Sequence, residues 1–357
     1  MLRSLVRLAL AHSKTLPNTE GVAIAGVKNI LIADATSISL NNALAPIFPS
    51  TGSGGKMAGI KLHGLFNVTT GELPYLNLTE ASRSDHTTKD DHFTISNPGD
   101  LLIRDLGYFE APDLDRLHRE KRFFITRVSM TVTQFLDAAD QQINVWDRLI
   151  SYKGFNLELN LKVGGGKFLH RFIAMRLPRK KWMKRLDDLS KEKGRALTKL
   201  EKTQAKWNLM ITNLTVEQAS RETIQHLYEM RWQIELLWKS LKSSLGIDRL
   251  RAATCENVVR AFIWAKLLNT VLLLNVRGLV TYHDHQEIGL IKWFRCVSAS
   301  FAKIREMLRQ KQWLALARLF RELAQQCFNQ KHSKPSTKEK LNESIDLHNK
   351  PTRGSNP

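Results

Sequence analysis

Four side chains of different chemistry recur at fixed offsets between residues 226 and 250. A tyrosine, an arginine, a glutamate and a lysine stand at offsets 0, +3, +7 and +14: Tyr228, Arg231, Glu235 and Lys242. On an α-helix, which turns about 100° per residue, these offsets fall within an arc of roughly 60°. Arginine forks suit phosphate, and a carboxylate suits a divalent cation. The spacing therefore predicts one helical face equipped to handle a phosphate ester.

A simpler interpretation of this face is a solvated surface. Arg231 and Glu235 would then form an i, i+4 ion pair worth about 0.3–0.5 kcal/mol. That interpretation leaves Tyr228, Trp238 and Lys242 unexplained. An apolar stripe runs beside the polar one, so the polar groups lie at the edge of a core, where unpaired charges are costly. The apolar stripe consists of Leu227, Met230, Ile234, Leu237 and Leu241.

Two aspartates follow apolar runs that predict buried strands. Asp34 follows residues 30–33 (ILIA), and Asp105 follows residues 101–104 (LLIR). We expect each carboxylate at or near the carboxyl end of its strand, where neighbouring strands would bring the two together. Together with Glu235 they would form three carboxylates, which cannot all stay ionised in contact without a cation. Such oxygen ligands suit Mg²⁺ or Mn²⁺, and two ions can clamp a phosphodiester.

The charge balance indicates an anionic polymer as partner. The 357 residues include 54 Lys and Arg against 34 Asp and Glu, a formal net charge of +20, which favours nucleic acid. Three widely spaced cysteines argue against a disulfide framework and a zinc site, and favour a reducing compartment such as the cytoplasm. The most apolar segment, residues 261–280, has only ten residues between Lys266 and Arg277. We therefore expect a buried helix and no membrane partner.

The remaining elements predict a sheet with helical excursions. Alternating and apolar runs favour strands within residues 27–80, 100–109 and 122–129, with a helix over 111–121. Residues 142–152, 155–178 and 206–214 read as a strand meander, interrupted by a charged helical or looped excursion over 179–206. One long helix follows from about 215 to 245.

Several segments resemble a known family. They are IADATSISL (32–40), LLIRDLGYF (101–109), ITNL (211–214) and YEMRWQIELLWKSLKS (228–243). The chain resembles bacterial insertion-sequence transposases with a D-D-E triad over roughly residues 25–285. The resemblance is greatest to the insertion-sequence-four branch, whose signature Y-(2)-R-(3)-E-(6)-K is complete at Tyr228, Arg231, Glu235 and Lys242.

The resemblance implies an α/β fold, an RNase H-like mixed sheet with an inserted β-rich subdomain and a helical C-terminal region. The expected division is a short N-terminal remnant (1–24), a catalytic core in two parts (25–127 and 215–285) around the inserted subdomain (128–214), C-terminal helices (286–330) and a disordered tail (331–357).

The resemblance also implies roles. Asp34 would bridge two Mg²⁺ or Mn²⁺ ions, Asp105 would complete one site and Glu235 the other. Tyr228, Arg231 and Lys242 would hold the phosphates beside the scissile bond. The activity would be cut-and-paste DNA transposition: cleavage at transposon ends, in some cases through a hairpin on the end, and strand transfer into target DNA. A homodimer would bridge two ends of double-stranded DNA, in association with the bacterial nucleoid.

The charged excursion offers a second DNA contact. Cations for phosphate surround an aromatic ring for stacking: Arg179, Lys180, Lys181 and Trp182. Trp146 and Trp207 are alternative stacking residues, and core packing is the simpler interpretation of any one of the three.

Only about thirty residues precede Asp34, too few for an independent DNA-binding domain. We therefore expect DNA binding with little sequence preference. Two other hypotheses stay open at this point. One is a truncated, catalytically silent DNA-binding remnant of such a transposase, and the other is a host nuclease of the same fold that hydrolyses DNA without joining it.

Overall fold

The computed structural model describes residues 1–13, 24–51, 56–128, 134–250, 252–284, 288–328, 342–343 and 345–346. The predicted disordered tail lies almost entirely outside these residues. The chain forms two compact units. The first consists of Met1–Val22, Lys28–Ser96 and Glu229–Asn342, and the second of Ala23–Val27, Asn97–Tyr228 and Glu343–Pro357. The domain boundaries expected from the sequence divide the chain differently and stay a prediction.

The first unit contains three antiparallel strands in the order β3-β2-β1: β1 (Ile30–Ser39), β2 (Gly59–Asn67) and β3 (Glu72–Glu80). They match the strands predicted within residues 27–80. A tight turn with Gly71 at φ +75° joins β2 to β3, a backbone conformation that favours glycine. Strand β2 lies between the other two and is buried over almost its whole length. It is the centre of this unit's core.

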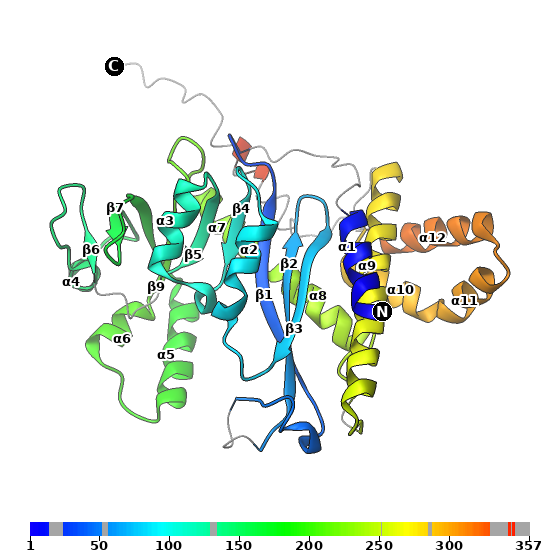
Figure 1. The fold of residues 1–357 in the computed structure, drawn as a ribbon. Coiled ribbons are helices and arrows are strands. Elements are labelled where there is room, and N and C mark those ends of the chain that lie inside the picture. Colours follow the sequence, from blue (N-terminus) through cyan, green and yellow to red (C-terminus); the bar gives the residue numbers. More distant parts are fainter. Residues whose placement is uncertain are drawn as a thin grey trace. The chain divides into compact units, whose positions relative to one another are not determined.

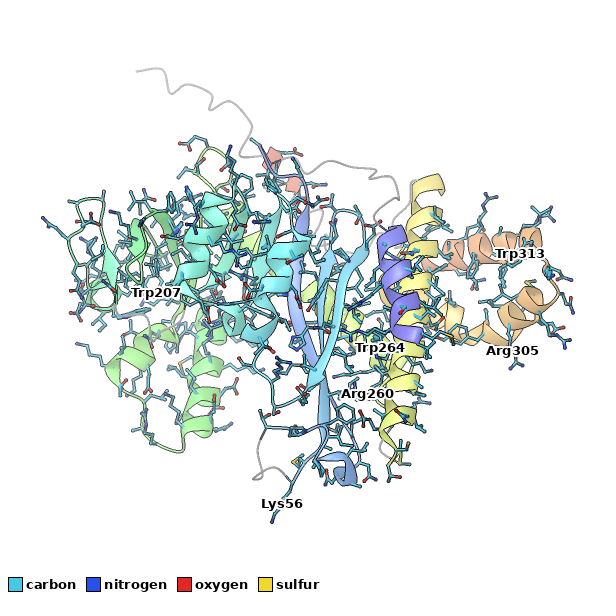
Figure 2. All side chains as sticks on the ribbon, viewed as in Figure 1. Lys56, Trp207, Arg260, Trp264, Arg305 and Trp313 are labelled. Carbon is cyan, nitrogen blue, oxygen red and sulfur yellow. The ribbon has the colours of Figure 1, made fainter. Side chains whose placement is uncertain are left out.

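Helix α1 (Leu2–Ser13) packs along α9 (Glu256–Asp284) and against β3 (Figure 1). The guanidinium of Arg3 lies 5.8 Å from the ring centroid of Trp264, a cation–π contact between the two helices. Figure 2 labels Trp264 on α9. Helix α2 (Lys89–Ile95) follows β3. The first part of the expected N-terminal remnant, residues 1–24, is thus a helix that packs on the first unit.

Helix α9 is long and apolar enough, over Glu256–Val280, to cross a membrane by length and composition. The sequence-based expectation that this segment is too short for a span is wrong on that criterion, because Lys266 and Arg277 lie inside one continuous helix. A buried core helix can have the same length and composition. Val259, Ile263 and Leu267 of α9 are almost fully buried, so one face of the helix packs in the unit's core.

Four further helices belong to the first unit: α8 (Trp232–Ser243), α10 (Leu290–Ala299), α11 (Phe301–Arg309) and α12 (Trp313–Cys327). Helix α8 packs on β1 and on α10. Trp293 of α10 is fully buried, and its Nε1 donates to the Leu273 carbonyl of α9 at 3.0 Å. The predicted helical C-terminal region is confirmed.

The second unit begins with a β-α-β arrangement. Strands β4 (Leu101–Arg104) and β5 (Phe123–Arg127) are parallel and are joined by α3 (Ala111–Arg119), which has a proline in its first turn. The order continues through antiparallel neighbours as β4-β5-β9-β8-β7-β6. These are β9 (Trp207–Thr212), β8 (His170–Arg176), β7 (Asn156–Val163) and β6 (Phe135–Leu136). The mixed α/β class is confirmed.

Residues 142–152, predicted as a strand, form instead helix α4 (Val145–Ser151). The Asn144 side chain accepts a hydrogen bond from the Asp147 backbone N–H at 3.1 Å. This N-cap stabilises the start of a helix, although the apolar pattern had predicted a strand. The charged excursion is helical, with α5 (Arg179–Lys193) and α6 (Lys199–Gln204), the latter starting in a capping box of Thr198 and Glu201.

His170 on β8 makes the second unit sensitive to acid. Its side chain is 1% exposed, and burial lowers its pKa to about 4, with Asp115 opposing the shift. The unfolded chain binds a proton near pH 6.5 and the folded chain only near pH 4. Stability is therefore lost as pH falls through this window, by up to about 3 kcal/mol for this group.

We expect His170→Gln to reduce that pH dependence. The measurement is urea unfolding at pH 7 and pH 4.5, compared as the difference between the two pH values for each protein. An equal difference in wild type and variant would contradict the assignment.

Candidate active site

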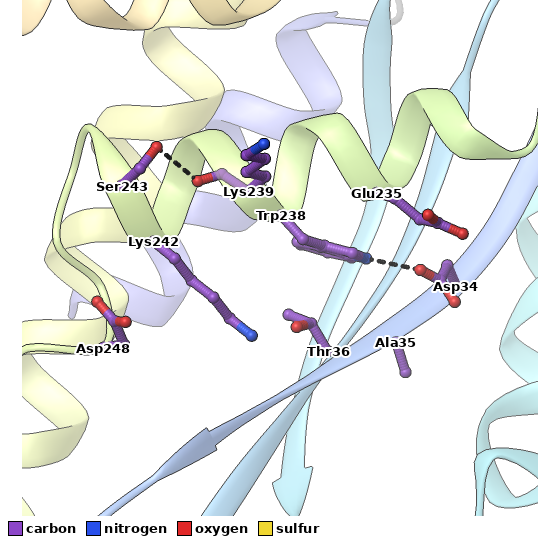
Figure 3. Close-up of a pocket in the computed structure, with 9 residues that line it drawn as sticks. All are labelled: Asp34, Ala35, Thr36, Glu235, Trp238, Lys239, Lys242, Ser243 and Asp248. Carbon is purple, nitrogen blue, oxygen red and sulfur yellow. Dashed lines mark hydrogen bonds between the residues drawn. The ribbon is translucent and has the colours of Figure 1, made fainter. Parts of the chain in front are cut away.

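One pocket of about 540 Å³ lies wholly in the first unit, between β1 and α8. Figure 3 shows the carboxylate of Glu235 on α8 near that of Asp34 on β1. The structure thus brings together two of the three predicted catalytic carboxylates. It also places two lysines beside them, of which Lys242 was predicted and Lys239 was not. The lining residues are Asp34, Ala35, Thr36, Glu235, Trp238, Lys239, Lys242, Ser243 and Asp248.

Asp34 lies in the middle of β1, not at its end. The strand continues to Ser39, because residues 35–39 keep their pairing with β2. The expectation of a strand-end aspartate is wrong for this residue. Its Oδ2 accepts a hydrogen bond of 3.2 Å from Nε1 of Trp238, an indole that is 4% exposed. The carboxylate is therefore oriented by a rigid, buried donor.

Gly64 makes room for that donor. It pairs with Asp34 across the β1–β2 ladder, and opposed residues of a ladder share a face. A Cβ on Gly64 would lie 2.8 Å from Cη2 of Trp238. The sequence gives no sign of this contact, since it depends on the strand register and on the way α8 packs over it.

We expect Gly64→Ala to lower the free energy of unfolding by roughly 1–3 kcal/mol, the usual cost of overpacking a close-packed core. Denaturant unfolding measures this change. In a Trp238→Leu background the smaller side chain leaves space, so the same substitution should cost much less. Equal costs in both backgrounds would show that the close contact with the indole is not the cause.

The predicted signature helix is interrupted. Helix α7 (Arg221–Glu229) ends before Met230, and α8 starts at Trp232, with Arg231 as its N-cap residue. The prediction of one continuous helix over 215–245, with all four signature residues on one face, is therefore wrong. The stretch contains no proline or glycine, and nothing in the sequence explains the break. Tyr228 belongs to the second unit, and the other three residues belong to the first.

Within the first unit, Arg231 and Glu235 form the i, i+4 ion pair of the simpler interpretation. The Arg231 Nη2 lies 2.6 Å from Oε1 of Glu235, whose side chain is 46% exposed. Lys242 donates from Nζ to the backbone carbonyl of Ser37 at 3.1 Å. Both cations are thus held by contacts with the pocket's own elements.

Asp105 directly follows β4 in the second unit, as the sequence predicted. Its Oδ1 accepts a hydrogen bond of 3.1 Å from the hydroxyl of Tyr228, so this signature tyrosine touches a predicted catalytic carboxylate. The preceding residue, Arg104, is buried to 1% exposure with Asp113 at 3.6 Å. Burial lowers the pKa of Arg104, and Asp113 opposes the shift.

The charged helix α5 has no buried residue, and Arg179, Lys180 and Lys181 are exposed at its start. Trp182 is only half-buried, with the Lys206 ammonium 5.5 Å from its ring centroid. In contrast, Trp146 is 8% exposed and Trp207 2% exposed. Of the three candidate tryptophans, Trp182 is therefore the most exposed.

The donor types fit the implied metal. Asp34 and Glu235 supply carboxylate oxygens at one pocket, which suits Mg²⁺ or Mn²⁺. Within the described part of the chain, no three His, Cys, Asp or Glu side chains are grouped so that they could hold a metal ion. A shared metal site of Asp34, Asp105 and Glu235 therefore stays a prediction.

Comparison with known proteins decides the family. The family described as "Transposase DDE domain" matches residues 25–272, more than half of the chain. The chain belongs to this family. Membership confirms the resemblance to bacterial D-D-E transposases, whereas the four-residue branch signature stays a prediction. Dependence on a divalent metal ion goes with the family in general.

Proteins similar to this chain include transposases of insertion sequences. The chain is 26% identical over 327 residues to the transposase for insertion sequence element IS231F of Bacillus thuringiensis subsp. israelensis, covering 84% of this chain and 68% of the relative. It is 29% identical over 258 residues to the putative transposase InsL for element IS186A of Escherichia coli (strain K12), covering 69% and 65%.

The chain spans between 59% and 68% of the length of five IS231 transposases. Among solved structures, the piggyBac transposase synaptic complex with hairpin DNA gives a TM-score of 0.47 at 8% identity, covering 88% of this chain and 60% of that one.

Proposed function

We propose that this protein is a DNA transposase that cleaves DNA at the ends of an insertion sequence and joins them to target DNA. The observation that carries the proposal is the pocket in which Asp34 and Glu235 face each other beside Lys239 and Lys242, in a member of the transposase DDE domain family. Carboxylates for a metal and cations for phosphate are the two needs of phosphodiester chemistry.

Each step would break one bond to phosphorus and form another. In cleavage, water attacks the scissile phosphate and the 3′-oxygen leaves as a hydroxyl. In joining, that hydroxyl attacks a target phosphodiester. Glu235 and Asp34 would hold the metal, with Asp105 from the second unit. Bound Mg²⁺, proposed as two ions, would supply charge neutralisation and activation of the attacking oxygen. Trp238 would keep Asp34 oriented, and Lys242 would hold a phosphate oxygen.

We also propose the assembly and location that the resemblance implies. A homodimer would hold two transposon ends in the cytoplasm, at the nucleoid. Exposed apolar side chains at the start of α12 support the dimer: Trp313, labelled in Figure 2, is 60% exposed, and Leu314 is 80% exposed. All three predicted carboxylates are present in the chain, and the family match does not specifically support the catalytically silent alternative.

Joining of DNA strands tests the proposal. The purified chain is incubated with a supercoiled plasmid carrying the gene's own flanking sequence, with Mg²⁺, with Mn²⁺ or with chelator. Metal-dependent nicks and joined products are expected. Nicks without joined products would favour the nuclease hypothesis, and DNA binding without cleavage in either metal would favour the silent remnant.

A further inference from the structure

A second pocket of about 580 Å³ adjoins the first in the same unit. The two pockets share three lining residues, Lys242, Ser243 and Asp248. They therefore form one continuous depression, which we call the β1–α8 groove. It runs from Asp34 and Glu235 along β1 towards Ser39 and the turn that follows α8. The second pocket is lined by Ser37, Ile38, Ser39, Lys242, Ser243, Asp248 and Arg249.

The two halves of the groove differ in chemistry. The first half holds the carboxylates Asp34 and Glu235. The outer half offers hydroxyls from β1 and α8 and the cations Lys242 and Arg249, against one carboxylate, Asp248. Hydroxyls and cations in a row are the usual contacts to the sugar-phosphate backbone of nucleic acid. The outer half is therefore suited to an extended anion and not to a second metal centre.

The cations of the groove are available to a ligand. Lys239, Lys242 and Arg249 form no ion pair with any carboxylate in the described ranges, and Lys242 bonds only the Ser37 carbonyl. Elsewhere in the unit, surface arginines such as Arg260 and Arg309 pair with a neighbouring glutamate. Unpaired cations lining a concave surface attract a polyanion.

The turn after α8 fixes Arg249 at the groove. Gly246 has φ +61°, and the backbone N–H of Ile247 donates to the Leu241 carbonyl at 3.2 Å. Ile247 and Leu250 are buried, whereas Asp248 and Arg249 are exposed. A Cβ on Gly246 would lie 2.9 Å from Cδ of Arg249, so the arginine stem packs directly on the turn. The turn therefore positions the stem of Arg249 at the groove.

We infer that the outer half of the β1–α8 groove binds the phosphate backbone of the DNA strand that leaves the cleavage pocket, with Arg249 as its outermost cation. This inference rests on the proposed function for the identity of the strand. The DNA strand would then run along β1, past Ser37 and Ser39. Arg249 would be a DNA-binding residue outside the Y-R-E-K signature.

DNA binding without turnover tests the inference. Affinity for a duplex from the gene's flanking sequence, and for its single strand, is measured in chelator over a range of salt concentrations. We expect Arg249→Ala to reduce the slope of log K against log salt by about 1, so that its deficit shrinks about fourfold between 50 and 200 mM salt. Asp248→Asn should have the opposite sign and tighten binding, because it removes a negative charge beside the phosphates.

The exposed pair Glu306 and Arg309 provides matched controls, since it lies on α11 and lines neither pocket. Arg309→Ala and Glu306→Gln should leave the slope unchanged. Equal effects at Arg249 and Arg309, or unchanged binding in both groove variants, would overturn the inference. This binding assay contains no metal, so it does not depend on cleavage. If the wild-type protein failed to cleave DNA in the plasmid assay, the proposed function would be refuted, but the measured effect of Arg249→Ala on DNA affinity would still stand.

Discussion

Glu235→Gln is expected to lower the rate of DNA cleavage more than about 100-fold, since even the outer-shell partners of metal ligands are typically worth 10- to 100-fold. Glutamine has the size of glutamate but carries no charge, so it is a much poorer ligand for Mg²⁺. The side chain is 46% exposed, and its ion pair with Arg231 is worth only about 0.3–0.5 kcal/mol. The fold should therefore survive the change, and DNA binding in chelator should be retained.

Glu306→Gln is the matched control for this loss. Glu306 is 47% exposed and pairs with Arg309 at 2.9 Å, much as Glu235 pairs with Arg231, but it lies on α11 away from the pocket. We expect it to cleave at the wild-type rate. If Glu235→Gln also cleaved within a few-fold of wild type, the ion pair would be the whole role of Glu235 and the solvated-surface interpretation would be correct.

Asp113→Ala is expected to destabilise the protein by about 3–5 kcal/mol, the usual cost of breaking a buried ion pair by removing one partner. Arg104 and Asp113 are 1% and 7% exposed, and the Arg104 guanidinium is buried with its pKa already lowered by burial. Removing the carboxylate leaves a cation that water cannot reach. Urea unfolding of the purified variant measures the change.

The double variant Arg104→Met, Asp113→Leu separates charge from packing. Replacing both partners by apolar side chains removes the stranded charge, so most of the lost stability should return. If the double variant were no more stable than Asp113→Ala, the unpaired charge of Arg104 would not be the cause of the destabilisation. Asp105 follows Arg104 directly, so the same variants also show whether this buried pair supports the end of β4 on which the predicted catalytic carboxylate lies.

Local patterns predicted most of the strands and the position of Asp105. The run at residues 101–104 is apolar, short and followed by Asp105, and the structure places β4 there. The alternation over residues 59–80 likewise predicted β2 and β3, because one period-2 pattern on each side of a turn has few alternatives. The family could also be inferred, since its motifs are contiguous in sequence.

The features that could not be predicted from the sequence depend on tertiary contacts. Apolar residues at helical spacing continue through Met230 and Ile234, so periodicity alone could not reveal the break between α7 and α8. The prediction that Asp34 lies at or near the end of its strand was wrong because the strand continues into the polar residues Thr36 and Ser37. These residues are held in the strand by pairing with β2 and not by burial. The Gly64–Trp238 contact joins residues from separate elements, and no local signal marks it.

The most direct measurement of the central claim is the metal preference of an Asp34→Cys variant in the plasmid cleavage assay. We propose that the Asp34 carboxylate binds the metal ion, so Asp34→Cys replaces an oxygen ligand by sulfur. Sulfur suits Mg²⁺ poorly but is better tolerated by the softer Mn²⁺. We predict that wild type cleaves with either ion, whereas Asp34→Cys is inactive with Mg²⁺ and recovers cleavage with Mn²⁺. The same activity of Asp34→Cys in both metals would contradict the claim that this carboxylate binds the metal ion.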